Sequence, residues 1–345
     1  METKTMDNFA DKLQKRIDQL GNPTCIGLDP MLSYLPPSLL KEYDCAQEEG
    51  IYQALSHFCC DLLVAVADLV PAVKPQMAYF EQYGLGGMRA LRAIIAKARS
   101  LNMLVILDGK RNDIGSTAAA YSRAYLSADD RPDDAGETTR KLDSGVRLPN
   151  EISAKQSSAK DTVLNDHAIE SFLTADALTV NAYLGLDGIQ PFLEQCRANG
   201  KGIFALCRTS NPSAGDLQDL ELADGRLVYE AMADLIATWG QDLIGETGIS
   251  SVGAVVGATW PQQARSLRKR MPHNFFLIPG FGAQGASARD AIAGFNHDGG
   301  AAIVNASRSL MLAWKKQGKD HEAYAEACRL EAISMRDALR SALGR

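Results

Sequence analysis

The strongest constraint on the fold is a repeated alternation of short β-rich runs with stretches of helical character. Eight such runs recur along the chain, and helical segments such as 87–99 and 226–244 lie between them. Runs three, six and seven are almost continuously apolar, as expected for strands buried on both faces of a parallel sheet. Eight β/α units predict an α/β fold, a closed (β/α)8 barrel of the TIM-barrel type. The runs are 24–29, 72–76, 103–110, 177–184, 202–210, 252–259, 275–282 and 301–309.

Composition narrows the classes of protein that remain. A chain of 345 residues, 46% hydrophobic, can bury the core of one barrel domain spanning 1–345. Its net charge of −6 argues against a nucleic-acid-binding surface but permits a local basic pocket for a small anion. No apolar run approaches the roughly 20 residues of a membrane span, and the N-terminal segment resembles an amphipathic helix, not a signal peptide. Seven cysteines without a CxxC pair indicate reduced thiols, so we expect a cytoplasmic protein.

Chemistry-bearing residues gather where the predicted strands end. The C-terminal ends of barrel strands carry the active site in this architecture. A single Asp there can instead cap a helix, and a single Arg can be a solvated charge. The coincidence at all eight strand ends nevertheless favours a site, whereas no GxGxxG or Walker motif supports a doubly wound nucleotide-binding sheet. The residues are Asp29, Lys74, Asp108, Lys110, Asn181, Ser210, Thr259, Gly282 and Arg308.

The stretch ILDGKRNDIG (106–115) concentrates charge behind the third apolar run. Asp108 and Lys110 are two residues apart, so their side chains point the same way if the strand persists to the lysine. Asp113 lies five residues beyond Asp108, on a loop before the helical TAAAYSRAYL segment. The sequence leaves the direction of that loop open, so Asp113 could serve this site or that of a neighbouring chain.

The stretch LDGKRNDIGSTAAAYS (107–122) resembles the D-x-K-x-x-D-I-x-x-T signature of the orotidine 5′-phosphate decarboxylase family, in its longer, mainly bacterial branch. Further motifs agree with this resemblance over most of the chain: CIGLDP, VKPQMAYFE, TVNAYLG, RTSNPSAG, PGFGAQG and NASRSL. The departures are small, with Gly109 in place of the usual Ala, Asn112 in place of Gly and Ala182 in place of Pro. The charged positions of the signature are all retained.

The resemblance implies conversion of orotidine 5′-phosphate to uridine 5′-phosphate and carbon dioxide in pyrimidine biosynthesis, without a metal or organic cofactor. Lys110 would stabilise the carbanion left at C6 and then protonate it, while neighbouring carboxylates keep the lysine charged. Asp108 would lie nearest the departing carboxylate, and Lys74 would bridge Asp108 and the ribose. These three residues and Asp113 would form one alternating network of coupled charges.

The resemblance also implies the remaining contacts. Asp29 would bind a ribose hydroxyl, and Asn181 would belong to the substrate site at strand four. Ser210 and Asn211 would contact the pyrimidine from a closing lid. Gly282, Gln284 and Arg308 would hold the phosphate, where a helix N-terminus is expected to follow PGFGAQG. Asp113, Ile114 and Thr117 would reach into the site of the partner subunit, so the implied active unit is a homodimer.

Two further segments of the chain have a predicted structure, and two other functions are compatible with the sequence. Residues 128–168 are polar and predict an insertion between the third helix and the fourth strand, leaving from the N-terminal face of the barrel. Residues 320–343 predict a C-terminal helical tail. One alternative function is a metal-dependent sugar-phosphate decarboxylase or aldolase-like synthase that shares D-x-K-x-x-D, and another is a catalytically silent nucleotide-binding barrel.

Overall fold

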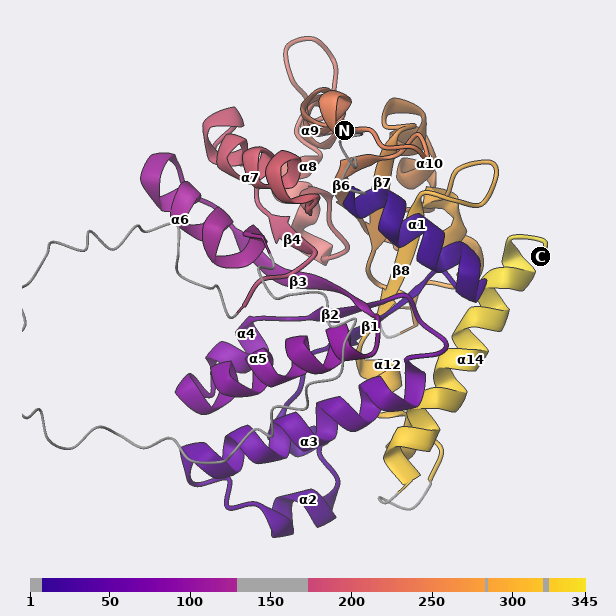
Figure 1. The fold of residues 1–345 in the computed structure, drawn as a ribbon. Coiled ribbons are helices and arrows are strands. Elements are labelled where there is room, and N and C mark those ends of the chain that lie inside the picture. The colour runs from indigo at the N-terminus through magenta and orange to yellow at the C-terminus, as the bar shows by residue number, and fades with distance from the viewer. Residues whose placement is uncertain (1–7, 129–172, 283–284, 319–322) are drawn as a thin grey trace, which may run out of the picture.

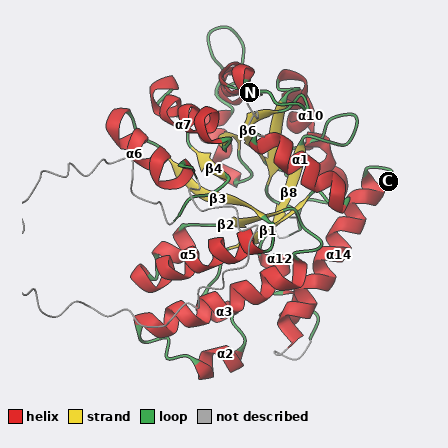
Figure 2. Ribbon diagram, viewed as in Figure 1, coloured by secondary structure: helices red, strands yellow, loops and turns green. Residues whose placement is uncertain are grey.

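Eight parallel strands form a closed barrel in the computed structural model, which describes residues 8–128, 173–282, 285–318 and 323–345. Neighbours in the chain are neighbours in the sheet, and β8 pairs with β1 to complete the ring. The strands lie inside a layer of helices (Figure 2). The predicted (β/α)8 fold is therefore confirmed, with a strand in each predicted run. The strands are β1 (Thr24–Leu28), β2 (Ala72–Pro75), β3 (Leu104–Arg111), β4 (Ala177–Val180), β5 (Gly202–Arg208), β6 (Ser250–Val256), β7 (Asn274–Ile278) and β8 (Ala302–Ala306).

The helices cover the outside of the barrel, and Figure 1 shows α14 running along one flank. The longer ones are amphipathic, because each must bury one face against the strands and expose the other. Their bounds are α1 (Phe9–Leu20), α2 (Pro37–Glu42), α3 (Glu48–Val66), α4 (Ala78–Glu81), α5 (Gly84–Ser100), α6 (Gly115–Leu126), α7 (Leu186–Asn199), α8 (Gly215–Gln218), α9 (Val228–Trp239), α10 (Pro261–Arg270), α11 (Ala288–Ala291), α12 (Arg308–Met311), α13 (Ala313–Lys316) and α14 (Tyr324–Ala342). Short 3-10 turns include η1 (Leu32–Tyr34) and η3 (Pro212–Ala214).

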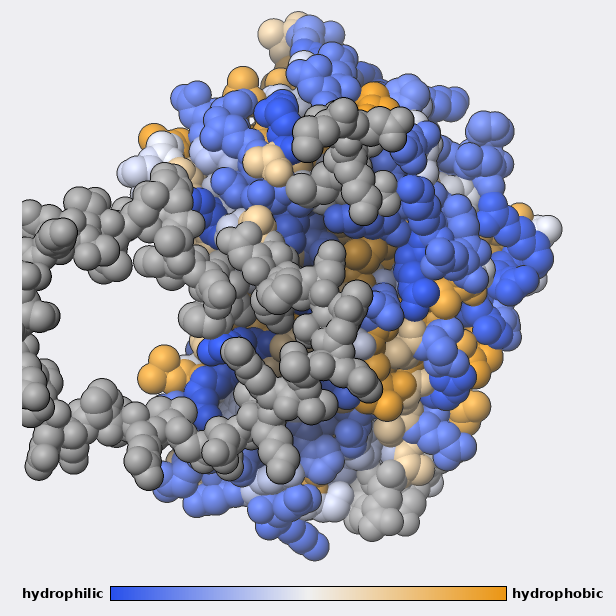
Figure 3. Space-filling model, viewed as in Figure 1, coloured by the Kyte–Doolittle hydropathy of each residue, from blue (hydrophilic) through white to orange (hydrophobic). Residues whose placement is uncertain are grey.

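Helix α1 closes the N-terminal end of the barrel. The side chain of Asn8 caps it by accepting a hydrogen bond from the Asp11 amide at 2.8 Å. Phe9 then packs edge-on against Phe204 inside the barrel, with ring centroids 5.8 Å apart. In Figure 3 the face seen with α1 in front is mostly hydrophilic where grey atoms do not cover it, in keeping with an apolar side turned inward. With this end filled, a ligand cavity must open at the C-terminal ends of the strands.

The segment between α6 and β4 includes almost all of the predicted insertion, and residues 129–172 lie outside the described part of the chain. Its described flanks meet, because the Ala175 amide donates to the Tyr125 carbonyl at 2.7 Å. Helix α6 ends and β4 begins on the N-terminal side of the barrel, which is the side predicted for the insertion. The C-terminal tail forms helix α14, which packs on α3. Arg329 of α14 forms an ion pair with Asp68, just after α3, at 2.5 Å.

Within the described residues, no helix is long and apolar enough to cross a membrane. All seven cysteines are free thiols.

Arg268 of α10 fastens the N-terminal side of β7 and β8. Its buried guanidinium donates to the carbonyls of Gly294, Met271, Asn274 and Ala301 at 2.7 to 2.9 Å. Removing this cation takes a charged donor from all four carbonyls, of which Met271 and Ala301 keep a second donor in the amides of Asn274 and Phe276.

We therefore expect Arg268→Met to lower the free energy of unfolding by about 3 kcal/mol or more, because each hydrogen bond lost between a charged donor and a buried carbonyl costs roughly 1.5 to 3 kcal/mol. Urea unfolding followed by circular dichroism measures the effect. Arg265→Met, on an exposed part of the same helix, is the control and should change stability by less than about 0.5 kcal/mol. An Arg268→Met protein as stable as the control would contradict the fastening role.

Candidate active site

Asp108 is the centre of the site. Its Oδ2 accepts from Lys74 Nζ at 2.7 Å and from Gln76 Nε2 at 3.1 Å. Its Oδ1 accepts from Lys110 Nζ at 2.6 Å and from the Thr179 hydroxyl at 2.8 Å. Four donors from three adjacent strands therefore fix one carboxylate. Both lysines predicted for the site meet at it.

The charges of this cluster stabilise one another. Burial of Asp108 disfavours its charged form, but the ammonium groups of Lys74 and Lys110 outweigh burial and hold the pKa of Asp108 far below its usual range. Burial would likewise lower the pKa of Lys74, whereas the negative charges of Asp108 and Asp29 raise it above its usual value. Asp108 is therefore a carboxylate, and Lys74 an ammonium, across the physiological pH range.

Lys110 reaches Asp108 by an irregularity in β3. Its backbone has φ +46°, in the left-handed region that residues with a Cβ rarely adopt. The register with β4 shifts at this point: Leu107 pairs with Leu178, but Arg111, four residues later, pairs with Val180, only two residues later. The Lys110 amide donates to the Thr179 hydroxyl at 3.0 Å, which secures the bulge. Backbone strain at a charged residue in a cavity indicates a functional position.

A cavity of about 500 Å³ opens above this cluster, at the C-terminal ends of the strands. Its size suits a small-molecule ligand. Seven predicted site residues line it: Asp29, Lys74, Asp108, Lys110, Ser210, Asn211 and Arg308. One carboxylate oxygen of Asp29 is buried without a hydrogen-bond partner, so it is available to a ligand donor.

The other predicted residues lie elsewhere. Asp113, Ile114 and Thr117 follow β3 outside the cavity lining, and Ile114 is 54% exposed. Asn181 turns its side-chain oxygen to the Tyr183 amide at 3.1 Å and is likewise absent from the lining. Gly282 lies next to the lining residue Phe281, whereas Gln284 is outside the described residues. The single chain therefore brings together the Lys74, Asp108 and Lys110 part of the predicted network, without Asp113.

The PGFGAQG loop, predicted to hold the phosphate, is not followed by the helix N-terminus that the sequence suggested. The helix after PGFGAQG, α11, begins only at Ala288 and lasts one turn, so it does not point a long helix N-terminus into the cavity. The loop before it needs glycine, with φ +99° at Gly280 and +69° at Gly282. The amide of Gly282 donates to the Ala286 carbonyl at 3.1 Å, within the loop. Among the described residues of this end, Arg308 is the cation that lines the cavity.

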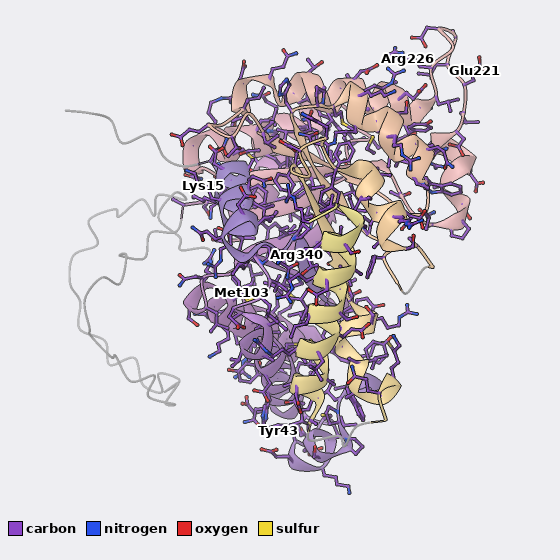
Figure 4. The ribbon with its side chains drawn as sticks, turned by 90° about the vertical axis from the view of Figure 1, so that its right-hand side faces the viewer. Lys15, Tyr43, Met103, Glu221, Arg226 and Arg340 are labelled. Atoms are coloured by element: carbon purple, nitrogen blue, oxygen red, sulfur yellow. The ribbon has the colours of Figure 1, made fainter. Side chains whose placement is uncertain are left out.

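Residues 209–215, here called the lid loop, follow β5 along one side of the cavity. The Trp260 indole donates to the Thr209 carbonyl at 3.1 Å, and a Cβ on Gly257 would lie 2.8 Å from that of Ser210. After α8 the chain forms a hairpin with Glu221 and Arg226, which projects from the molecule in Figure 4. The base of the lid loop is thus held by direct contacts with the α10 side of the barrel.

Sequence reasoning missed several cavity residues. Gln76 and Thr179 bind Asp108 directly, and Asn305 places an unpartnered, buried Oδ1 in the cavity lining. Each had a signal in its position, since Gln76 and Thr179 lie within predicted runs two and four and Asn305 within run eight. Within the described part of the chain, no three His, Cys, Asp or Glu side chains are arranged to hold a metal ion.

A closed barrel with coupled charges and a cavity at its C-terminal strand ends defines a barrel enzyme that acts on a small molecule. The sequence matches the profile of the "Orotidine 5'-phosphate decarboxylase / HUMPS family" over residues 23–130 and 161–323, and the interruption falls in the polar segment before β4. The chain belongs to the orotidine 5′-phosphate decarboxylase family.

Individual proteins show the same similarity along nearly the whole chain. A Rhodopirellula baltica protein named orotidine 5′-phosphate decarboxylase is 40% identical over 339 residues, 97% of this chain and 100% of that one. A protein of the same name from Clostridium tetani is 36% identical over 97% of this chain and 99% of its own. The crystal structure of a Streptomyces avermitilis protein described as a putative orotidine 5′-phosphate decarboxylase has a TM-score of 0.71 and 30% identity, covering 100% of this chain and 99% of that one.

Proposed function

We propose that this protein converts orotidine 5′-phosphate to uridine 5′-phosphate and carbon dioxide, as a carboxy-lyase of pyrimidine biosynthesis. The observation that carries the proposal is the Asp108 carboxylate fixed between Lys74 and Lys110 in a 500 Å³ cavity. The names of the relatives at 40% and 36% identity support the substrate. Seven free thiols support a reducing location, which we take to be the cytoplasm.

The reaction breaks the bond between C6 and its carboxylate, and the electron pair stays on C6 while carbon dioxide leaves. This pair lies in the plane of the ring, so the π-system delocalises it poorly and a fixed positive charge is needed. Lys110 supplies that charge and afterwards donates a proton from Nζ to C6, regaining it from water. Asp108 holds Nζ at 2.6 Å and so orients the ammonium before the substrate binds. The proposed chemistry uses side chains of the protein and no cofactor.

Substrate recognition is assigned to the rest of the lining. Asp29, with its unpartnered oxygen, accepts a hydrogen bond from a ribose hydroxyl, and Lys74 interacts electrostatically with both Asp29 and Asp108. Ser210 and Asn211 face the pyrimidine from the lid loop. Asn181 lies outside the cavity lining and accepts a hydrogen bond from the Tyr183 amide. Its proposed role in the substrate site is therefore to shape the loop after β4.

The phosphate is assigned to Arg308, together with Gly282 and Gln284. A guanidinium offers several parallel donors to phosphate oxygens, and binding there holds the reacting carbon in place from a distance. We expect Arg308→Ala to lower kcat/KM for orotidine 5′-phosphate by about 100-fold or more while leaving turnover of the nucleoside orotidine unchanged.

Steady-state kinetics with both compounds measure this difference. Arg289→Ala removes an exposed guanidinium of α11 outside the cavity lining and is the control. If the parent enzyme converted orotidine as efficiently as orotidine 5′-phosphate, the proposed contribution of phosphate binding by Arg308 to catalysis would be wrong.

We also propose a homodimer with shared sites. Exposed apolar side chains surround the Asp113 loop: Ile114, Tyr183, Leu184 and Leu186 are 44% to 72% exposed. The Asp113 loop approaches the first turn of α7, since a Cβ on Gly188 would lie 2.9 Å from the Asp113 carbonyl. An apolar patch of this kind, beside a charged residue left outside the single-chain cavity, fits an interface that delivers Asp113, Ile114 and Thr117 to a second chain.

One assay separates the proposal from its rivals. Loss of orotidine 5′-phosphate absorbance is followed with and without a chelator, and the expected result is equal turnover in both. A metal-dependent sugar-phosphate enzyme would lose activity with the chelator or ignore this substrate. That rival also needs free carboxylate oxygens, whereas both oxygens of Asp108 already accept hydrogen bonds from ammonium groups. Tight binding without turnover would instead identify a silent nucleotide-binding barrel.

A further inference from the structure

Arg208, the last residue of β5, carries a buried cation directly beneath the lid loop. Its side chain is 1% exposed and lies over the Trp260 ring, 4.7 Å from the centroid. Its Nε donates to Gln263 at 2.6 Å and its Nη2 to Asp219 at 3.1 Å. A guanidinium held by stacking and by several hydrogen bonds has one geometry, so it can fix the orientation of any group that it contacts.

Gln218 is the contact that links Arg208 to the cavity. A guanidinium has donors only, so the amide of Gln218 must turn its Oε1 toward Arg208 Nη1, at 3.1 Å. The same Oε1 accepts from the Thr209 amide at 3.0 Å. The Gln218 Nε2 must therefore donate, and its partner is the Thr209 hydroxyl at 2.8 Å. Arg208 and the Thr209 amide, both donors to the same oxygen, together determine which way round this side-chain amide lies.

The Thr209 hydroxyl connects the oriented Gln218 amide to Asn211 through two hydrogen bonds. Because it accepts from Gln218, its own proton is free to donate, and Asn211 Oδ1 lies 2.6 Å away. That distance is typical of a hydroxyl donor and short for an amide donor. With its oxygen occupied, Asn211 has its Nδ2 left for a ligand in the cavity that it lines. The chain of contacts makes Asn211 a donor.

The proposed binding pose, on which this step rests, indicates the ligand atom. It places C6 at Lys110 on β3 and the ribose toward β1 and β2, the strands of Asp29 and Lys74. The other side of the ring, carrying C5 and the C4 carbonyl, then faces β4 and β5. We infer that Arg208 is a positioning residue which, through Gln218 and Thr209, makes Asn211 donate to the C4 carbonyl and so selects uracil-type over 4-amino pyrimidine nucleotides.

Reversing the chain of hydrogen bonds tests this inference. In Gln218→Glu the carboxylate still accepts from Arg208 and from the Thr209 amide, but it must also accept from the Thr209 hydroxyl. Thr209 then has only a lone pair for Asn211, whose amide must turn and present its oxygen to the cavity. The ligands are uridine and cytidine 5′-phosphates, which carry the same phosphate, so the added charge affects both equally. The readout is the ratio of their dissociation constants from calorimetry.

We expect the parent protein to bind uridine 5′-phosphate at least about tenfold more tightly than cytidine 5′-phosphate, and Gln218→Glu to bring the ratio to about one or below. Asp219→Asn keeps a hydrogen-bonding oxygen for Arg208 outside the chain of contacts, so the ratio should stay within about twofold of the parent. Thr209→Val removes the hydroxyl without adding charge and should also reduce the ratio.

Turnover of orotidine 5′-phosphate by the parent protein is measured beside these titrations. Turnover with an unchanged ratio in both Gln218→Glu and Thr209→Val would overturn the inference and leave the proposed function intact. Equal binding of the two nucleotides by the parent would overturn it as well. A parent protein without turnover would reject the proposed function, whatever the ratio.

Discussion

Lys110→Ala is expected to lower kcat for orotidine 5′-phosphate by at least about 10⁴-fold, because one group both stabilises and protonates the carbanion. The ammonium lies 2.6 Å from Asp108, and Lys74, the other ammonium at this carboxylate, is buried on the opposite oxygen. Lys74 is held at that oxygen by a 2.7 Å hydrogen bond, so we do not expect it to replace the Lys110 ammonium at C6. The measurement is loss of substrate absorbance at saturating concentration, and residual activity within about tenfold of the parent would reject the assignment.

A second substitution separates chemistry from folding. Lys110 has φ +46°, so alanine at this position keeps the backbone strain whereas glycine relieves about 1 kcal/mol of it. We expect Lys110→Gly to be as inactive as Lys110→Ala but more stable to urea. Recovery of activity in the more stable variant would show that the alanine protein had failed by misfolding.

The fold could be predicted because its signal is repeated. Eight short β-rich runs recur, three of them almost continuously apolar, and their alternation with helices allows few arrangements other than a closed barrel. The run ends were less accurate. Run five was predicted to reach Ser210, but β5 ends at Arg208, since the residues after it turn into the lid loop and line the cavity. Polar residues that follow an apolar strand extend a sequence pattern without extending the sheet.

The charged centre could be predicted in part. The spacing of Asp108 and Lys110 suggested that they meet, and they do, but through a bulge with positive φ and not through a regular strand. That bulge depends on Thr179, a residue 69 positions away from Lys110 in the chain, so no local pattern reveals it. Arg208 was hidden for a different reason. A charged residue in a strand run suggests exposure, whereas in the fold the rings of Trp260 and Tyr229, distant in the chain, cover Arg208.

The position of Asp113 remained open in the sequence, and the single chain leaves it outside the cavity lining. The expected explanation is a partner subunit, which makes a mixing experiment decisive. Lys110→Ala and Asp113→Ala proteins should each be nearly inactive. A mixed dimer would contain one site with both residues intact, formed by Lys110 of one chain and the loop of the other.

Random exchange of two such proteins makes about half of the dimers mixed, each with one working site of two, so about a quarter of parental activity should return. Two Lys110→Ala preparations mixed under the same conditions form the control and should recover nothing. Native mass spectrometry measures the exchange independently of activity. If the chains exchange and activity stays absent, Asp113 serves the site of its own subunit, and the exposed apolar side chains around it need another explanation. If activity returns, the aspartate that the sequence placed five residues beyond Asp108 is the group that makes each site depend on two chains.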